Sequence, residues 1–153
     1  MITFQIDPWD TFIRDAHYLF PEHYAELSLD KERFQLSLYE DRYRFAEKEG
    51  VLHIVTARDD ETVIGYWVGA VLPHLHYSKS GLMASTDMYF LTKASRSGNL
   101  GFRFVSFIEN SLIAKGVVKL YVSWRVHRDL QKFWESLGYR FTDKMFTKLL
   151  EAH

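Results

Sequence analysis

The chain has 153 residues, of which 47% are hydrophobic and 16% are aromatic, enough for a domain with a bulky core. Its 19 basic and 20 acidic side chains nearly cancel, so the charge gives no reason to expect binding to nucleic acid or to a membrane surface. The absence of cysteine excludes a disulfide framework, a thiolate nucleophile and a cysteine-based zinc site. Neither a signal peptide nor an apolar run of about 18 residues is present, so we expect a cytoplasmic protein.

The first fifty residues predict a short strand and two helices. Residues 3–6 alternate weakly in polarity, and apolar residues at helical spacing then favour a helix over residues 9–20. Pro21 is expected to end that helix, because proline lacks the N–H that a helix needs. A loop or short helix is expected over residues 22–29, and a second helix over residues 30–50.

The middle of the chain predicts three strands, over residues 51–57, 63–72 and 82–91. The second of them is apolar on both of its alternating faces, which is typical of a central strand that is covered on both sides. Its two glycines indicate a bulge or a close approach of another backbone. A loop rich in histidine and tyrosine, over residues 73–81, separates the second strand from the third.

The third strand leads through a polar turn over residues 92–99 into a long helix, which Lys115 and Gly116 end. A strand over residues 117–124 follows this helix. Because strand, helix and strand make a βαβ unit, the strands on either side of the helix should be parallel.

The last part of the chain predicts a short helix that opens at His127 and ends at Gly138. A hairpin of residues 139–141 and 145–150 is expected to follow it. No repeat or linker divides the sequence, so we expect one domain over residues 1–153. The element order favours an α/β (α+β) fold with a single mixed sheet and helices on both of its faces.

The polar turn before the long helix holds the residue types of an anion site. Arg96, Ser97, Gly98, Asn99 and Gly101 lie where the helix begins. A helix N-terminus presents unpaired N–H groups, glycine lets an anion approach the backbone, and arginine adds donors that suit phosphate oxygens. An ordinary turn between a strand and a helix is the alternative.

Residues 96–101, RSGNLG, resemble the R/Q-x-x-G-x-G/A signature of the GCN5-related N-acetyltransferase (GNAT) superfamily, with Asn99 in place of the middle glycine. The order of elements over residues 51–150 is also similar, and Gly138-Tyr139 is similar to the family's L-G-F/Y. Small GNATs of tailed bacteriophages are more similar still, in the segments HYAE at residues 23–26, LHIVTARDD, PHLHY, GVVKLYVSWRVH and LGYRFTDKMFTK.

This resemblance implies a mostly antiparallel mixed sheet that splays at its parallel strand pair. It implies transfer of an acetyl group from acetyl-CoA to an amine of a small molecule or a protein, without a metal. The protein would act in the cytoplasm of a phage host, and GNATs are often homodimers. The alternative is a non-catalytic GNAT-fold protein that binds acyl-CoA or takes part in virion or host interactions, which the replacement of two family residues, at Asn99 and Trp134, favours.

In the family, backbone N–H groups of the turn wrap the pyrophosphate, and the pantetheine arm lies between the splayed strands. The resemblance places the cofactor contacts at Leu91, Thr92, Lys93, Arg96, Ser97, Gly98, Asn99, Gly101, Phe102, Phe133 and Trp134.

Asp87 is the candidate general base, because several GNATs have an acidic residue at this point of the strand and because a carboxylate in an apolar strand is costly. It could instead accept an N–H from a loop at the entrance of the strand. Trp134 stands where many members have a tyrosine that protonates the departing thiolate, and an indole cannot act as that acid. His127 is the candidate replacement, with a capping contact at the helix start as its alternative.

The acceptor side is expected to involve His23, Glu26, His76 and Tyr77, since the first helices roof this side in GNATs. Ordinary surface or loop-packing roles are the alternative for all four. The histidines and Glu26 also have the donor atoms of metal ligands, but nothing in the sequence fixes their mutual geometry, and we expect no metal.

Overall fold

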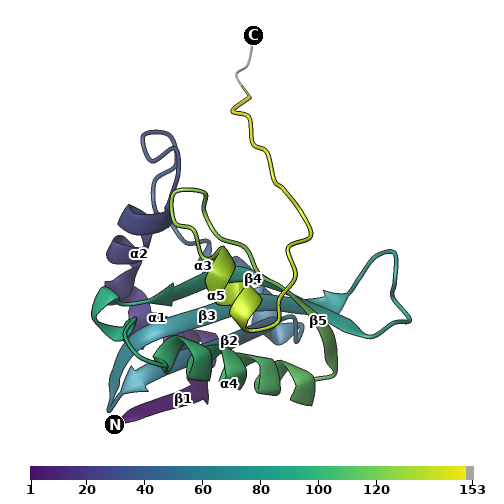
Figure 1. Ribbon diagram of the computed structural model, residues 1–153, viewed down its shortest axis with the longest axis horizontal. Coiled ribbons are helices and arrows are strands. Elements are labelled where there is room, and N and C mark those ends of the chain that lie inside the picture. Colours follow the sequence, from purple (N-terminus) through teal and green to yellow (C-terminus); the bar gives the residue numbers. More distant parts are fainter. Residues whose placement is uncertain (151–153) are drawn as a thin grey trace. The chain divides into compact units, whose positions relative to one another are not determined.

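The computed structural model describes residues 1–150, which belong to two compact units, Met1–Ser123 and Trp124–His153. The first unit holds one five-stranded sheet in the order β1-β2-β3-β4-β5 (Figure 1). Neighbouring strands are antiparallel except for β4 and β5, which are parallel. The strands are β1 (Ile2–Ile6), β2 (Leu52–Asp59), β3 (Thr62–Pro73), β4 (Leu82–Leu91) and β5 (Val117–Tyr121). The expected mixed, mostly antiparallel sheet with one parallel pair is confirmed.

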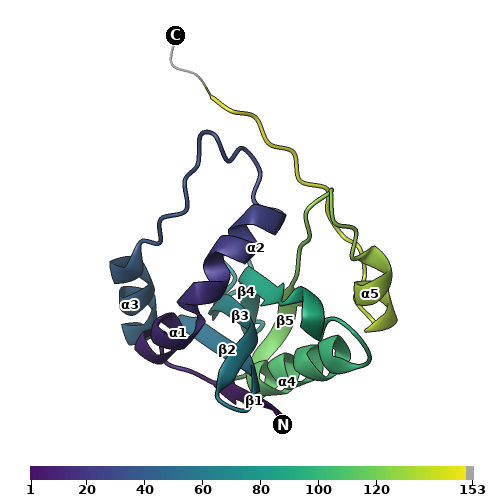
Figure 2. The same cartoon turned by 90° about the vertical axis from the view of Figure 1, so that its left-hand side faces the viewer.

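Helices cover both faces of this sheet, as Figure 2 shows with the sheet between them. Three helices and a 3-10 turn lie on one face, and one long helix lies on the other. On the first face are α1 (Trp9–Ala16), the turn η1 (His17–Leu19), α2 (Phe20–Leu27) and α3 (Glu40–Lys48); on the second is α4 (Leu100–Ala114). A short 3-10 turn, η2 (Lys93–Ser95), connects β4 to α4.

The central strand β3 contributes to a separate apolar core on each face of the sheet. Tyr66 and Val68 pack with the side chains of α1 and α2, whereas Trp67 and Val71 pack with those of α4. Successive side chains of a strand point to opposite faces, so a strand that is apolar at every position needs cover on both sides. The predicted two-sided burial of this strand is therefore confirmed.

Both glycines of β3 lie where a neighbouring backbone comes close. A Cβ added to Gly65 would be 2.7 Å from the carbonyl oxygen of Phe90, and one added to Gly69 would be 2.8 Å from that of Ser85. The second position is closed further by the indole of Trp67, 2.1 Å from the added atom. No side chain fits in either place, which confirms the predicted close approach.

The first helices differ from the prediction at both of their boundaries. Pro21 lies in the first turn of α2 and so opens a helix instead of ending one, because the N–H that proline lacks has no partner in a first turn anyway. The predicted helix over residues 30–50 is wrong in nearly its whole first half, since α3 begins only at Glu40. The hydroxyl of Tyr24 lies within donor distance of the carbonyl oxygens of Lys31 and Phe34. In a helix these oxygens would accept backbone N–H groups instead.

Over its described residues, 124–150, the second unit contains one short helix, α5 (Gln131–Ser136). It begins after the predicted His127, and Asp129 Oδ1 accepts the backbone N–H of Gln131 at 2.9 Å. Trp134 is buried and meets the rings of Phe133 and Tyr139 edge-on, each at a centroid distance of 5.1 Å.

The predicted final hairpin is wrong, since no strand is found over residues 139–150. Met145 and Phe146 have 88% and 89% of their surfaces exposed. A run of residues with high strand propensity forms a strand only with a partner strand and a face to bury, and neither is present for it in the described residues. The strand predicted over residues 117–124 is likewise shorter, because β5 ends at Tyr121.

Among the described residues, no helix is both long enough and apolar enough to cross a membrane.

His53 of β2 is a buried histidine on the face that α4 covers. Its Nε2 is 2.8 Å from Ser111 Oγ of α4, and its ring meets the indole of Trp67 edge-on at 6.1 Å. Ser111 donates its own hydroxyl proton to the carbonyl of Ile108, so the histidine is the donor to Ser111 Oγ. The neutral form of the His53 ring therefore fits this buried site, and the charged form with two N–H groups does not.

We expect acid to destabilise the fold through His53. Burial, with a smaller contribution from Lys115, lowers the pKa of His53 to about 4, from an ordinary value near 6.5. As the pH falls through this window, the unfolded chain takes up a proton that the folded protein does not, so the free energy of unfolding should fall by about 3 kcal/mol. Urea unfolding at pH 7 and pH 4.5 measures it. His53→Gln should flatten the difference and His17→Gln, at an exposed position, should not; an unchanged profile in His53→Gln would contradict the assignment.

Candidate active site

The parallel pair β4–β5 opens halfway along β4. The two strands are paired from Leu82 opposite Val117 to Ser85 opposite Tyr121. There β5 ends, whereas β4 continues for six more residues to Leu91. Within Met1–Ser123, this second half of β4 is paired only with β3, so its other edge keeps backbone groups that no strand takes up.

Side chains fix the point at which the strands separate. Trp67 Nε1 donates to Thr86 Oγ1 at 3.0 Å, and Thr86 Oγ1 donates to the carbonyl oxygen of Tyr121 at 2.9 Å. Thr86 follows Ser85, the last residue of β4 that pairs with β5. Its hydroxyl therefore bonds to β5 at the position where a further backbone hydrogen bond would otherwise form. This role of Thr86 was not predicted, because a threonine in a strand is common in any sheet.

The turn after β4 leads to an uncapped helix N-terminus. No side chain caps α4 at Asn99, and its first turn holds no acidic residue. Gly98 has a φ of +68°, in the left-handed region, and a Cβ placed on it would meet nothing within 4 Å. The turn therefore borders open space, and the N-terminus of a 15-residue helix supplies positive potential there. These are the properties of an anion site that the sequence predicted.

Arg96 ties this turn to two other elements. Its Nε donates to the carbonyl oxygen of Leu91 at 2.9 Å, and its Nη2 donates to Glu26 of α2 at 2.8 Å. The guanidinium also lies over the ring of Phe90, 5.5 Å from its centroid. Burial lowers the pKa of Arg96 from its ordinary value, and the charge of Glu22 acts against that change. Arg96 and Glu26, which the resemblance placed on the cofactor and acceptor sides, are thus bonded to each other.

Asp87 is the extra residue of a bulge in β4. Val68 and Gly69 of β3 pair with Met88 and Thr86, so Asp87 has no partner across the strands. Bulges turn a side chain away from its regular direction and are frequent beside active sites. The carboxylate is exposed, and its Oδ2 accepts the hydroxyl of Tyr43 from α3 at 2.6 Å.

His23 of α2 lies over the same open half of β4. Its ring stacks on Phe90 at 4.9 Å, and its Nδ1 shares a hydrogen bond of 2.7 Å with the hydroxyl of Tyr66. Burial, with Glu22 adding to it, raises the pKa of Tyr66, so this phenol stays protonated. The histidine is therefore held in one orientation by a rigid, buried partner.

These contacts bring four of the predicted residues to one face of β4, the face that α1, α2 and α3 cover. They are Asp87, His23, Glu26 and Arg96. Tyr43 joins them through Asp87 and was not predicted, because nothing local in its own helix marks it.

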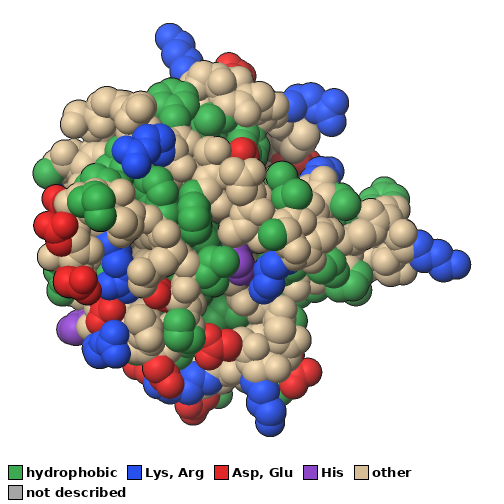
Figure 3. Space-filling model, turned by 90° about the horizontal axis from the view of Figure 1, so that it is seen from below, with side chains coloured by type: hydrophobic (Ala, Val, Ile, Leu, Met, Phe, Trp, Pro, Cys, Tyr) green, Lys and Arg blue, Asp and Glu red, His purple; other side chains and the backbone are tan. Residues whose placement is uncertain are grey.

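His76 and Tyr77 lie away from this group, in the connection between β3 and β4. This connection projects beyond the sheet at the end opposite α2 (Figures 1 and 3). Both rings contact His74, at centroid distances of 5.4 Å and 4.9 Å. Contact of His76 and Tyr77 with an acceptor stays a prediction.

Three of the predicted residues belong to the second unit. His127 lies in the turn before α5, and Phe133 and Trp134 lie within that helix. Their roles toward a cofactor and a leaving thiolate stay predictions. Among residues 1–150, no group of three or more histidine and acidic side chains is arranged to hold a metal ion.

No protein-family model matches the sequence, and no curated protein matches it. Solved structures do resemble the fold. An aminoglycoside acetyltransferase from an uncultured soil metagenomic sample has 12% identity and a TM-score of 0.76, with 98% of this chain and 97% of that chain covered. Glucosamine-6-phosphate N-acetyltransferase from Arabidopsis thaliana has 13% identity and a TM-score of 0.71, with 99% of both chains covered.

A transcriptional regulator from Bacillus halodurans C-125 is also similar, at 15% identity and a TM-score of 0.74, covering 98% of this chain and 100% of that chain. At such identities the likeness shows the fold, and the mixed sheet with its parallel β4–β5 pair is the GNAT fold. Proteins with different descriptions share it, so the function has to be argued from the site.

Proposed function

We propose that this protein is an N-acetyltransferase of the GNAT superfamily, which transfers an acetyl group from acetyl-CoA to an amine of a small molecule or a protein. The observation that carries the proposal is the open half of β4, which leads through the turn of residues 92–99 to the uncapped N-terminus of α4. An extended ligand arm can add to a free strand edge through main-chain hydrogen bonds, and a phosphate can bind at a helix N-terminus. A ligand that has both an extended arm and a phosphate can therefore occupy the open edge of β4 and the N-terminus of α4 together.

The residues present suit acetyl-CoA. On this proposal the backbone of residues 97–101 and Phe102 holds the pyrophosphate beside Arg96, and the backbone of residues 91–93 meets the pantetheine arm. The open space at Gly98 and the absence of acidic residues in the first turn of α4 support it. Acetyl-CoA supplies an acetyl group activated as a thioester. Phe133 and Trp134 of the second unit are proposed to contact the same molecule.

The chain's own chemistry is proposed to centre on Asp87. An acceptor amine is protonated near neutral pH, so it must first give a proton to a base, for which the exposed carboxylate of Asp87 is suited. The amine then forms a C–N bond to the acetyl carbon while the C–S bond breaks, and the electron pair of that bond stays on the sulfur. The second proton that the nitrogen loses on becoming an amide passes to water. His127 is the proposed donor to this thiolate, since the indole of Trp134 can give only a hydrogen bond.

The acceptor is proposed as a compound or protein with a primary amine. Enzymes with this fold include acetyltransferases for an aminoglycoside and for glucosamine 6-phosphate, which gives the first acceptors to try. Free thiol released from acetyl-CoA can be measured with a thiol reagent, and the chain adds no background because it has no cysteine. Calorimetric binding of CoA together with thiol release over a panel of sisomicin, glucosamine 6-phosphate, spermidine and a peptide with a free N-terminus tests the proposal. Binding without any release would favour a non-catalytic acyl-CoA-binding protein, and no binding would refute both.

Arg96→Ala should weaken CoA binding by about 1.5–3 kcal/mol, because the variant loses a charge beside the turn and the bond that fixes the turn to Leu91. Calorimetric titration with CoA measures the loss. Arg42→Ala, at an exposed position of α3, is the matched control and should bind as the wild type does. A folded Arg96→Ala variant with unchanged affinity would argue strongly against this site.

A further inference from the structure

The hydroxyl of Tyr43 is bonded to the residue proposed as the base. Tyr43 lies on α3 and Asp87 on β4, 44 residues later in the chain, and the distance from the hydroxyl to Oδ2 is 2.6 Å. Asp87 lies in a bulge, which turns its side chain away from the regular alternation of the strand. The hydrogen bond from Tyr43 then holds one oxygen of the carboxylate in place.

The ring of Tyr43 is held firmly enough to orient another group. It stacks on the fully buried indole of Trp9, with centroids 4.3 Å apart and planes 3° from parallel. Two further bonds join α3 to α1: the backbone N–H of Trp9 donates to Glu47 at 2.7 Å, and Arg44 donates to Asp10 at 3.1 Å. The phenol is therefore part of a packed helix pair and not a mobile surface side chain.

The phenol is the donor in its bond to Asp87. Burial first, and the neighbouring carboxylate second, raise the pKa of Tyr43 well above its ordinary value, so it keeps its proton at any working pH. Its bond occupies Oδ2, and Oδ1 of Asp87 accepts no hydrogen bond from the described residues. One oxygen is thus fixed and the other is left for an incoming group.

We propose that Tyr43 is a positioning residue for the acetyl-transfer reaction: its hydroxyl holds Asp87 so that Oδ1 faces the acceptor amine. This inference rests on the proposed function, in which Asp87 takes the proton of that amine. Tyr43 contributes through Asp87, without touching the acceptor.

The test is a double-mutant cycle of Tyr43→Phe and Asp87→Asn, followed by thiol release at pH 7 with acetyl-CoA and an acceptor from the panel that the wild type uses. Tyr43→Phe should lower kcat about tenfold and leave the KM for acetyl-CoA unchanged, since it removes one charge-assisted hydrogen bond on the acceptor side. In the Asp87→Asn background the same change should cause no further loss. Tyr39→Phe, at an exposed position beside α3, is the matched control and should change nothing.

The thermal midpoints of two Tyr43 variants distinguish the role of the ring from the role of the hydroxyl. Tyr43→Phe keeps the stack on Trp9 and should keep the thermal midpoint, whereas Tyr43→Met should lose both kcat and stability. An unchanged kcat in Tyr43→Phe, or a loss that persists in the Asp87→Asn background, would overturn the inference while leaving the proposed function intact. A wild type that binds CoA and acetylates nothing on the panel would instead overturn the proposed function, and the role of Tyr43 with it.

Discussion

Asp87→Asn should lower the turnover of acetyl transfer by about 10²–10⁴-fold at pH 7, the range that is typical for a lost acid–base catalyst. An ordinary alkyl ammonium has a pKa of about 10, so almost none of the acceptor is in its free form at neutral pH without a base. The loss should therefore shrink as the pH rises toward 10 and free amine becomes available. Thiol release against pH, on any acceptor that the wild type uses, measures it.

The asparagine variant is a fair test because its side chain keeps the shape of the carboxylate. The amide oxygen can still accept the hydroxyl of Tyr43, so the thermal midpoint should not change. Asp10→Asn, which changes an exposed carboxylate of α1, should leave turnover unaffected. Full activity of Asp87→Asn at pH 7, together with lost activity in His127→Ala, would show that the base is assigned wrongly and that His127 is the residue to follow.

The parts of the fold that the sequence could predict are those that depend on neighbours in the chain. The burial of β3 on both faces follows from apolar residues at nearly every position, and the parallel β4–β5 pair follows from a strand, a helix and a strand in succession. The start of α4 was likewise marked by a cluster of small and polar residues before a 3.6-residue apolar pattern.

Other elements could not be predicted, because an apolar pattern does not say whether a face will be covered. Phe34 and Phe45 have the spacing of a buried helix face, yet 56% and 59% of their surfaces are exposed. Residues 145–150 have the composition of a strand, yet no partner strand meets them in the described part of the chain. In both segments the deciding quantity was a tertiary contact, which local propensity does not contain.

The candidate site was predictable in its backbone and not in its side-chain partners. The turn at residues 96–101 and Asp87 were proposed from the sequence as site residues, and the structure adds the bulge that turns Asp87 out of the ladder. The bond from Tyr43 to Asp87 and the bond from Arg96 to Glu26 join residues that are 44 and 70 positions apart. Such pairs are fixed by the packing of α2 and α3 on the sheet, which the sequence does not show directly.

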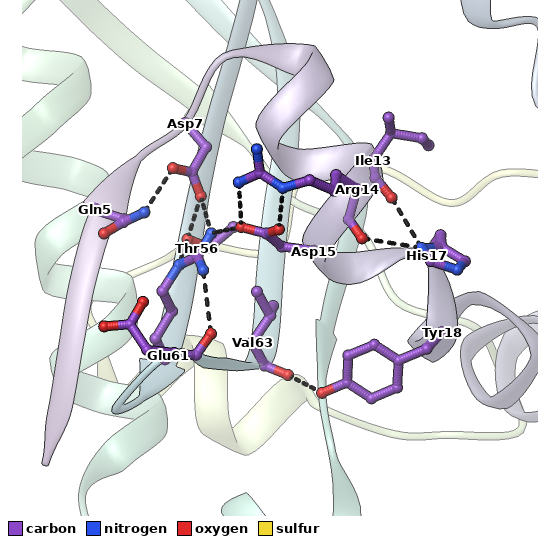
Figure 4. Close-up of polar contacts among 11 residues, drawn as sticks. Gln5, Asp7, Ile13, Arg14, Asp15, His17, Tyr18, Thr56, Glu61 and Val63 are labelled. Carbon is purple, nitrogen blue, oxygen red and sulfur yellow. Dashed lines mark hydrogen bonds and ion pairs between the residues drawn. The ribbon is translucent and has the colours of Figure 1, made fainter.

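A buried ion network on the same face of the sheet leads to the largest effect that we expect on stability. Arg58 of β2 has only 6% of its surface exposed, and its Nη2 donates to Asp7 at 2.9 Å and to Asp15 at 3.0 Å. Figure 4 shows how Gln5 and Thr56 complete the bonding of Asp7, each at 2.6 Å. Burial opposes the charge of Arg58, but its bonds to the two carboxylates outweigh burial and raise its pKa. Asp7, which is 6% exposed, depends on this partner to offset its own charge.

Arg58→Ala should therefore lower the free energy of unfolding by about 3–5 kcal/mol, because it leaves the buried carboxylate of Asp7 with neutral partners only. Arg14→Ala is the matched control: Arg14 bonds Asp15 as well, but its side chain is 69% exposed, so its loss should cost no more than about 1 kcal/mol. Urea unfolding of both variants at pH 7 measures the difference.

The bonds to Arg14 and Arg58 lower the pKa of Asp15. The contribution of Asp15 to the free energy of unfolding is therefore complete above the ordinary aspartate pKa and is lost only as the pH falls below that value. If Arg58→Ala and Arg14→Ala lose the same small amount of stability, water must reach Asp7 in the folded protein and solvate its charge.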